Sequence, residues 1–252
     1  MRYWLVMPAA GSGRRFGGAK QYALLDGRTV LETALQPFLD DPQCCGGALV
    51  LAGTDPQRQR LATMVGERLL IVEGGAERAH SVCNGLAALQ HRATADDWVL
   101  VHDAARPLLS AADLARLLSI GGSDEVGALL AAPVADTVKR ARGHALAAGG
   151  VRCEATVPRE ALWLAQTPQM FRYAPLRSAL ERAILEQRQP TDEAQAMQWQ
   201  GQDALLVQAL DSNFKLTTAA DLWLASAILR SRREASAAAG LSAGQAPKER
   251  LP

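Results

Sequence analysis

The sequence is poor in the residues from which zinc sites and disulfide networks are built. Its four cysteines, at positions 44, 45, 83 and 153, include no Cys-x-x-Cys pair and no spacing suited to zinc. The histidines at 80, 91 and 144 also lack ligand spacing, so we interpret His102 as structural rather than as part of a metal-dependent phosphohydrolase. The cysteines are therefore expected to be reduced thiols in a reducing compartment.

Excess charge and long apolar runs are lacking as well. Lysine and arginine number 27 against 26 aspartates and glutamates, a net charge of +1, whereas nucleic-acid-binding proteins usually carry a markedly basic surface. No apolar stretch is long enough to span a bilayer or to form the core of a signal peptide. We therefore expect a cytoplasmic protein with no nucleic-acid partner and no membrane contact. The hydrophobic content of 48% over 252 residues is ample for a buried core.

The chain contains short apolar runs instead. Four of them are separated by segments with helical spacing: 3–8, 48–53, 69–74 and 98–103. In segment 77–89, for example, Val82, Leu86 and Leu89 fall on one helical face. This alternation predicts an α/β fold with a mostly parallel sheet covered on both faces. Further strands are expected at 126–134, 162–166 and 204–210, and further helices at about 172–187 and 217–232.

Two segments differ from this pattern. Residues 136–160 contain two polar, β-prone stretches around a Gly/Ala turn, which predicts a protruding hairpin without a core of its own. Such a hairpin needs a partner surface. Residues 233–252 are of low complexity and are expected to form a disordered tail, so the folded domain is predicted to span residues 1–232.

The stretch 8-PAAGSGRRFGGAKQY-22 follows the first apolar run and contains no carboxylate. Its residues suit a phosphate cradle: Gly11, Gly13, Arg14, Arg15 and Lys20. It is not a dinucleotide fingerprint, because Phe16 stands where the third glycine belongs, and no Gly-Lys-Ser/Thr of a Walker loop follows. A surface turn with solvated cations is the alternative. The position at the end of a strand favours the cradle.

A carboxylate follows the fourth run, in 102-HDAARP-107. Asp103 is placed where the sheet would point it into the same crevice, and one carboxylate beside phosphates suits Mg²⁺. Its other interpretation is a helix cap or a turn residue. Arg106, before a proline, suits either a phosphate or a salt bridge.

Three later signals are weaker. Segment 74-GGAERAHSVCNGL-86 offers backbone N–H groups at a helix start, or is a plain loop-to-helix turn. In 191-TDEA-194, Thr191 is expected first of all to cap a helix. Lys215 lies between Phe214 and Leu216 in a strand-like stretch, so its ammonium must emerge on the opposite face and needs a partner if that face is covered.

Seven motifs together resemble the 2-C-methyl-D-erythritol 4-phosphate cytidylyltransferases of the non-mevalonate isoprenoid pathway. In order, over about residues 1–232, they are PAAGSGRRF, GGAERAHSVCNGL, HDAARP, PVADTVKR, QTPQMF, TDEA and NFKLT. The resemblance implies a Rossmann-like nucleotidyltransferase domain, a homodimer made by a β-arm, and Mg²⁺-dependent transfer of CMP from CTP to 2-C-methyl-D-erythritol 4-phosphate, with release of pyrophosphate.

The resemblance also implies residue roles. Arg15 and Lys20 resemble the pair that grips the triphosphate and the transition state, Lys215 resembles a catalytic lysine near the α-phosphate, and Asp103 resembles the Mg²⁺ ligand. Ala10, Gly11, Gly75 and Ser81 resemble the cytosine-reading positions, beside Gly13 of the cradle. Arg106, Thr137 and Thr191, with Arg159 and Thr167 from the neighbouring arm, resemble the acceptor-phosphate site. The pattern departs at Ala19, where the family usually has proline before the Lys-Gln pair, and the loop from Gly17 to Lys20 is shorter.

The residues fit this chemistry without the resemblance. An acceptor phosphate is already ionised near pH 7, so its attack on a nucleotide needs fixed cations and positioning rather than a general base or a protein nucleophile. Two alternatives remain. One is a cytidylyltransferase for another sugar-alcohol phosphate such as ribitol 5-phosphate. The other is a non-catalytic nucleotide-binding regulatory subunit, which the presence of Asp103, Lys20 and Lys215 together argues against.

Overall fold

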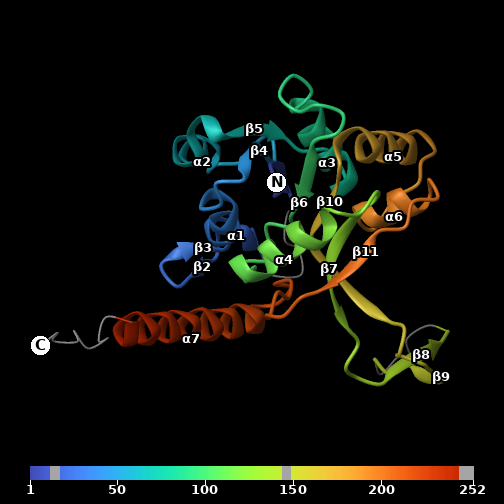
Figure 1. Ribbon diagram of the computed structural model, residues 1–252. Coiled ribbons are helices and arrows are strands. Elements are labelled where there is room, and N and C mark those ends of the chain that lie inside the picture. The colour runs from blue at the N-terminus through green and yellow to red at the C-terminus, as the bar shows by residue number, and fades with distance from the viewer. Residues whose placement is uncertain (12–17, 144–148, 244–252) are drawn as a thin grey trace, which may run out of the picture.

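The central element is a seven-stranded sheet with the strand order β11-β7-β10-β6-β1-β4-β5 (Figure 1). The computed structural model describes residues 1–11, 18–143 and 149–243. The strands are β1 (Tyr3–Pro8), β4 (Cys44–Leu51), β5 (Leu69–Glu73), β6 (Trp98–Val101), β7 (Gly127–Pro133), β10 (Trp163–Arg172) and β11 (Leu205–Gln208). Only β10 pairs antiparallel within this sheet, with β6 and with β7. The predicted α/β class and the mostly parallel sheet are confirmed.

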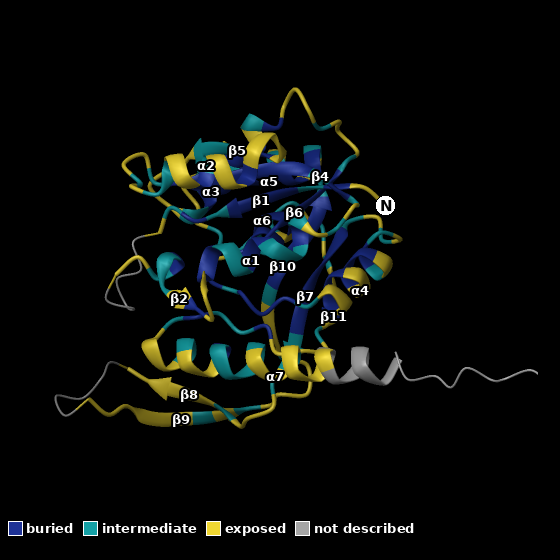
Figure 2. Ribbon diagram, turned by 90° about the vertical axis from the view of Figure 1, so that its left-hand side faces the viewer, coloured by how far each residue is buried: buried dark blue, intermediate teal, exposed yellow. Residues whose placement is uncertain are grey.

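Helices cover both faces of the sheet, so the protein has a core on each side (Figure 2). One core lies under α1 (Val30–Leu39), α2 (Arg58–Val65) and α4 (Ala111–Gly121), and the other lies under α3 (Arg78–Ala88), α5 (Tyr173–Leu185) and α6 (Glu193–Gln198). Successive side chains of a strand point to opposite faces. Accordingly Leu5 and Met7 of β1 pack in the first core and Val6 packs in the second. This two-sided burial explains why the strand sequences are continuously apolar.

The strand boundaries differ from the predictions at two places. β4 begins at Cys44 rather than at 48. Gly46 and Gly47 weaken the strand propensity of this segment, but they allow the backbones of β4 and β1 to approach closely. A Cβ on Gly47 would lie 2.1 Å from the carbonyl oxygen of Leu5. β10 continues to Arg172, well beyond the predicted end at 166, because its second half pairs with β6. The remaining runs form strands within a few residues of their predicted limits.

The predicted hairpin is present as β8 (Val138–Arg142) and β9 (Arg152–Val157), an antiparallel pair outside the main sheet. It projects away from the body, and most of its residues are exposed (Figures 1 and 2). Two short elements pack elsewhere on the surface: the 3-10 helix η3 (Gly66–Arg68) and the β2–β3 pair (Leu24–Leu25 and Arg28–Thr29). The hairpin therefore has the form expected of an arm.

The expected boundary of the disordered tail, residue 233, is wrong. Helix α7 (Ala219–Ala243) continues through the segment 233–243, and residues 244–252 lie outside the described part of the chain. Alanine has the highest helix propensity of all residues, so an alanine-rich segment of low complexity extends a helix that has already begun. Nowhere in the described chain does a helix combine the length and apolarity needed to cross a membrane.

Gly127 provides a test of the packing between β7 and β10. Its φ of +134° is unfavourable for other residues, and an added Cβ would lie 2.1 Å from the Met170 carbonyl oxygen. We expect Gly127→Ala to lower the free energy of unfolding by about 2 to 4 kcal/mol in urea denaturation. Gly149→Ala is the control, because Gly149 also has a positive φ of +81° but no atom of the described residues lies within 4 Å of an added Cβ. Equal losses for the two variants would contradict this account.

Candidate active site

A cavity of about 500 Å³ opens at the carboxyl ends of β1, β5 and β6. β4 and β5 lie on one side of β1 and β6 lies on the other, so the chain changes direction across the sheet at this point. Crevices at such a point are the usual ligand sites of open α/β sheets. The walls are formed by segments 8–11, 75–78 and 103–105 with Lys20, Gln21, Ser81 and Lys215.

Asp103 lies at the centre of the site and contacts two cations. Its Oδ2 accepts a hydrogen bond from Nζ of Lys215 at 2.7 Å, and its Oδ1 accepts one from Nε of Arg78 at 2.9 Å. Asp103 is buried, and Lys215 reaches it from a segment more than a hundred residues later. The prediction that Lys215 needs a partner is confirmed, although segment 211–217 forms no strand.

The charges around Asp103 keep it ionised. Burial alone would raise the pKa of this carboxyl, but the Arg78 and Lys215 charges and their hydrogen bonds outweigh burial and hold the pKa well below its usual range. The site therefore presents a permanently charged carboxylate between two cations. A ligand that enters the cavity meets both signs of charge within a few ångströms.

His102 is structural, as predicted. Burial lowers its pKa to about 4, so the imidazole is neutral at physiological pH. The Thr167 hydroxyl accepts a hydrogen bond from the backbone N–H of Asp103 at 3.1 Å and lies 3.0 Å from Nδ1 of His102. The other ring nitrogen, Nε2, lies 3.0 Å from the carbonyl oxygen of Arg106. A neutral ring that accepts from the hydroxyl at Nδ1 and donates from Nε2 satisfies both contacts and fixes the backbone behind Asp103.

Arg78 and Glu193 were not singled out from the sequence. Nη1 and Nη2 of Arg78 donate to the two carboxylate oxygens of Glu193 at 2.6 and 3.0 Å, and Glu193 is fully buried. Burial disfavours the charged form of Arg78, but Glu193 and Asp103 raise its pKa above the ordinary value. The available signals were the helix start at GGAER and the acidic TDEA motif, which by themselves do not reveal that the two residues pair.

The predicted nucleotide-reading residues of the described chain come together on one wall. Ala10, Gly11, Gly75 and Ser81 all line the cavity. The N–H of Gly75 donates to the Ser81 hydroxyl at 3.1 Å, and a Cβ on Gly74 would lie 2.4 Å from that of Ala10. The segment after β1 and the segment after β5 therefore pack so closely that a side chain at Gly74 would not fit between them.

The glycine loop is held at both of its described ends. The amide of Gln21 donates to the carbonyl oxygens of Ala9 at 3.2 Å and of Gly11 at 3.3 Å. Lys20 begins the 3-10 helix η2 (Lys20–Tyr22), lines the cavity, and donates from Nζ to the carbonyl oxygen of Leu216 at 2.9 Å. Gln21 is a site residue that the sequence analysis missed. Gly13 and Arg15 lie outside the described residues.

Two predicted acceptor residues contact the backbone of their own chain. Arg106 donates to the carbonyl oxygens of Asn213 at 2.7 Å and of Ala165 at 3.2 Å. Thr167 was expected to come from the arm of a neighbouring subunit, and this is wrong. It lies in β10 of the main sheet, is buried, and holds Asp103 of the same chain, because β10 extends further than its sequence predicted.

The other predicted acceptor residues lie outside the cavity wall. Thr137 and Arg159 flank the hairpin, and Arg159 donates to the carbonyl oxygen of Ala135 at the hairpin base. Thr191 is exposed and does not cap α6 as expected. The cap is Asp192, whose Oδ1 accepts from the N–H of Gln195 at 2.9 Å, because the chain enters the helix one residue later.

The site can hold a divalent cation only with help from a ligand. Among the described residues, no three His, Cys, Asp or Glu side chains gather to form a metal site. Asp103 offers the carboxylate. Its Oδ1 and Oδ2 accept hydrogen bonds from Arg78 and Lys215, and each carboxylate oxygen has lone pairs for more than one contact. Mg²⁺ characteristically takes one or two carboxylates and completes its shell with phosphates and water. The residues present therefore fit Mg²⁺ that binds together with a phosphate-bearing ligand.

Comparisons with known proteins agree with this geometry. A family model described as 2-C-methyl-D-erythritol 4-phosphate cytidylyltransferase matches residues 3–231. A protein of that name from Halorhodospira halophila is 47% identical over 241 residues, which cover 93% of this chain and 97% of the relative. One from Stenotrophomonas maltophilia strain R551-3 is 48% identical over 221 residues, covering 87% and 93%.

A solved structure is similar as well. The crystal structure of 2-C-methyl-D-erythritol 4-phosphate cytidylyltransferase from Thermus thermophilus superposes with a TM-score of 0.73 at 33% identity, covering 91% of this chain and all of the other. The match of the family model extends over nearly the whole described chain. The chain therefore belongs to the family of 2-C-methyl-D-erythritol 4-phosphate cytidylyltransferases.

Proposed function

We propose that this protein transfers CMP from CTP to 2-C-methyl-D-erythritol 4-phosphate, giving 4-diphosphocytidyl-2-C-methyl-D-erythritol and pyrophosphate, in isoprenoid precursor biosynthesis. The observation that carries the proposal is the Lys215–Asp103–Arg78 cluster, which lies in a cavity walled by the glycine loop and the Gly75–Ser81 segment. Pyrophosphate release from CTP should require this acceptor. If CTP releases pyrophosphate with ribitol 5-phosphate but not with 2-C-methyl-D-erythritol 4-phosphate, ribitol 5-phosphate is the acceptor. If neither compound leads to release, the protein is not a catalyst of this reaction.

This transfer of CMP requires positively charged groups in fixed positions around the phosphates. A phosphate oxygen of the acceptor attacks the α-phosphorus of CTP, and the bond from that phosphorus to the bridging oxygen breaks as pyrophosphate leaves. Lys20 and Lys215 line the cavity where negative charge gathers on the phosphates, and Arg15 belongs to the same loop sequence as Lys20. Their hydrogen-bond donors offset charge without a proton transfer, so no general base is needed.

We also propose that Mg²⁺ takes part, held by Asp103. When bound, the cation neutralises phosphate charge and makes the α-phosphorus more electrophilic. Arg78 and Lys215 hold the Asp103 carboxylate in a fixed direction, and Thr167 and His102 hold its backbone. The acceptor is proposed to bind near Arg106, Thr137 and Thr191, with Arg159 supplied by a second subunit.

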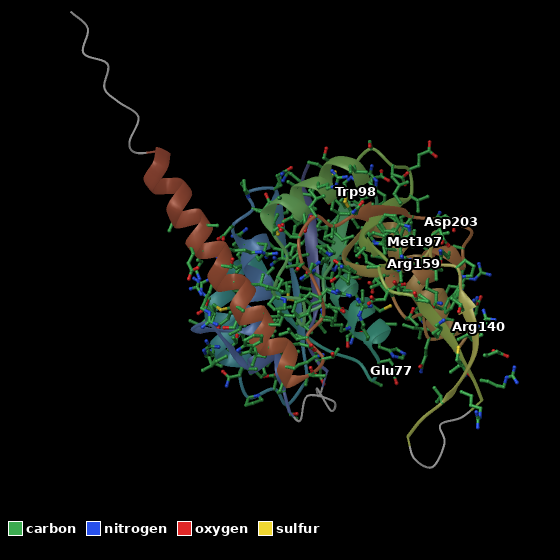
Figure 3. All side chains as sticks on the ribbon, turned by 90° about the horizontal axis from the view of Figure 1, so that it is seen from below. Glu77, Trp98, Arg140, Arg159, Met197 and Asp203 are labelled. Carbon is green, nitrogen blue, oxygen red and sulfur yellow. The ribbon has the colours of Figure 1, made fainter. Side chains whose placement is uncertain are left out.

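A homodimer through the hairpin is part of the proposal. The hairpin residues are largely exposed, and Arg140 and Arg159 lie on the side of the molecule away from α7 (Figure 3). Large apolar side chains are exposed where the hairpin joins the main sheet and along its β11 edge: Trp163, Leu164, Leu205, Leu206 and Leu210. A second copy that covers this surface would complete the acceptor site.

The four free cysteines support a cytoplasmic location.

Asp103→Asn tests the metal ligand. The substitution removes the charge that pairs with Arg78 and Lys215, so turnover should fall at least about tenfold and the Mg²⁺ concentration for half-maximal activity should rise. Asp113→Asn is the control, because Asp113 is also buried but accepts from the N–H groups of Leu210 and Asp211 outside the cavity. An unchanged Mg²⁺ dependence in Asp103→Asn would rule out this role.

Lys20→Met tests transition-state stabilisation. Loss of one such donor typically costs about 2.7 to 4 kcal/mol of barrier, so kcat should fall about 100-fold or more while the Kd of CTP changes much less. Steady-state kinetics and calorimetry measure the two quantities separately. If kcat is retained and only KM rises, Lys20 binds the ground state and transition state equally.

Mixed dimers test the shared site. Lys20→Ala and Arg159→Ala are each expected to be inactive, and the two chains are unfolded and refolded together in equal amounts. A heterodimer then has one site with both defects and one with neither, so random pairing should restore about a quarter of all sites. No recovery in a mixture shown to contain heterodimers would mean that Arg159 serves its own chain. If the protein is a monomer in solution, the hairpin cannot supply Arg159 to a second subunit, and the proposed shared site is wrong.

A further inference from the structure

Glu193 is a buried charge for which the proposed reaction has no direct use. It is fully buried, and both of its oxygens accept from Arg78. A buried ion pair is weak support for stability, because desolvation of the two charges offsets their attraction. The position of the pair suggests another task.

The pair restricts how Arg78 can bind Asp103. Because Nη1 and Nη2 of Arg78 are both engaged by Glu193, only Nε reaches Asp103, at 2.9 Å. Without Glu193, the guanidinium could turn and grip both oxygens of Asp103 in the usual bidentate geometry, which would compete with Lys215 and with any cation. Glu193 also balances the charge, since two carboxylates and two cations together carry no net charge.

The pair also joins two parts of the site. Arg78 begins α3, directly after the Gly75–Glu77 wall of the cavity. Glu193 begins α6, two residues after Thr191. Asp103, at the end of β6, contacts Arg78 between them. Arg78 therefore links the start of α6 to Asp103 through its own side chain.

We propose that Glu193 is a positioning residue which acts through Arg78 to fix the direction of the Asp103 carboxylate. This inference rests on the proposed function, because it assigns a task within that reaction. The alternative is that the pair only keeps a buried charge neutral. The two explanations predict different results when the charges of Arg78 and Glu193 are removed together.

The experiment compares Glu193→Gln with the double variant Arg78→Gln/Glu193→Gln. The single variant leaves Arg78 without its main counter-charge, so its Tm should fall by roughly 5 to 15 °C. The double variant restores neutrality, so its Tm should return to within about 3 °C of the wild-type value. Its kcat should nevertheless stay about 10- to 100-fold low, and the Kd of CTP measured by calorimetry with Mg²⁺ should rise about tenfold.

A double variant with wild-type Tm, kcat and Kd would overturn the proposal and leave a purely structural pair. Glu193→Asp covers the case in which the double variant does not fold: it keeps the charge but withdraws the carboxylate by one methylene, so kcat should fall about tenfold, and an unchanged kcat would also overturn the proposal. Arg177→Gln/Glu181→Gln removes a partly exposed ion pair of α5 outside the cavity, and it should change neither kcat nor the Kd of CTP. If the wild-type protein itself releases no pyrophosphate, the proposed function fails instead.

Discussion

The site depends on one constraint, which is that a buried carboxylate must stay ionised where a polyphosphate is to bind. Asp103 alone would be destabilised by burial and would repel the ligand. Lys215 and Arg78 offset the cost of burial by pairing with the Asp103 carboxylate, and they also present positive charge to the ligand. Because Arg78 is itself partly buried, it is paired with Glu193 in turn. The chain of alternating charges therefore follows from the placement of a single aspartate.

The fold provides these contacts from distant parts of the sequence. The parallel sheet brings the ends of β1, β5 and β6 to one edge, and β10, which pairs with β6 in the same sheet, places Thr167 behind Asp103. Gln21 holds the two described ends of the glycine loop against β1. The helices that cover the two faces bury most of the strand side chains in two separate cores.

Much of this was predictable from local signals, and the failures have physical reasons. Apolar runs predicted the strands, and the end of a strand predicted where Asp103 lies. Arg78 and Glu193 were missed because their pairing joins residues 115 apart in sequence, and charged residues at helix starts ordinarily face solvent. Thr167 was assigned to the arm by the family resemblance alone, and the pairing of β10 with β6, which sequence propensity does not reveal, places it in the main sheet instead. The tail boundary failed because low complexity was given more weight than the helix propensity of alanine.

The central claim is that the site joins an acceptor phosphate to the α-phosphorus of CTP. The most direct test uses 2-C-methyl-D-erythritol 4-phosphate with ¹⁸O in its phosphate group, unlabelled CTP, and ³¹P NMR of the products. The account predicts ¹⁸O in the bridge of the new diphosphate, seen as an isotope shift on the cytidine-side phosphorus, with pyrophosphate that carries no label. A cytidine-side phosphorus without the shift, or ¹⁸O in the pyrophosphate, would contradict it.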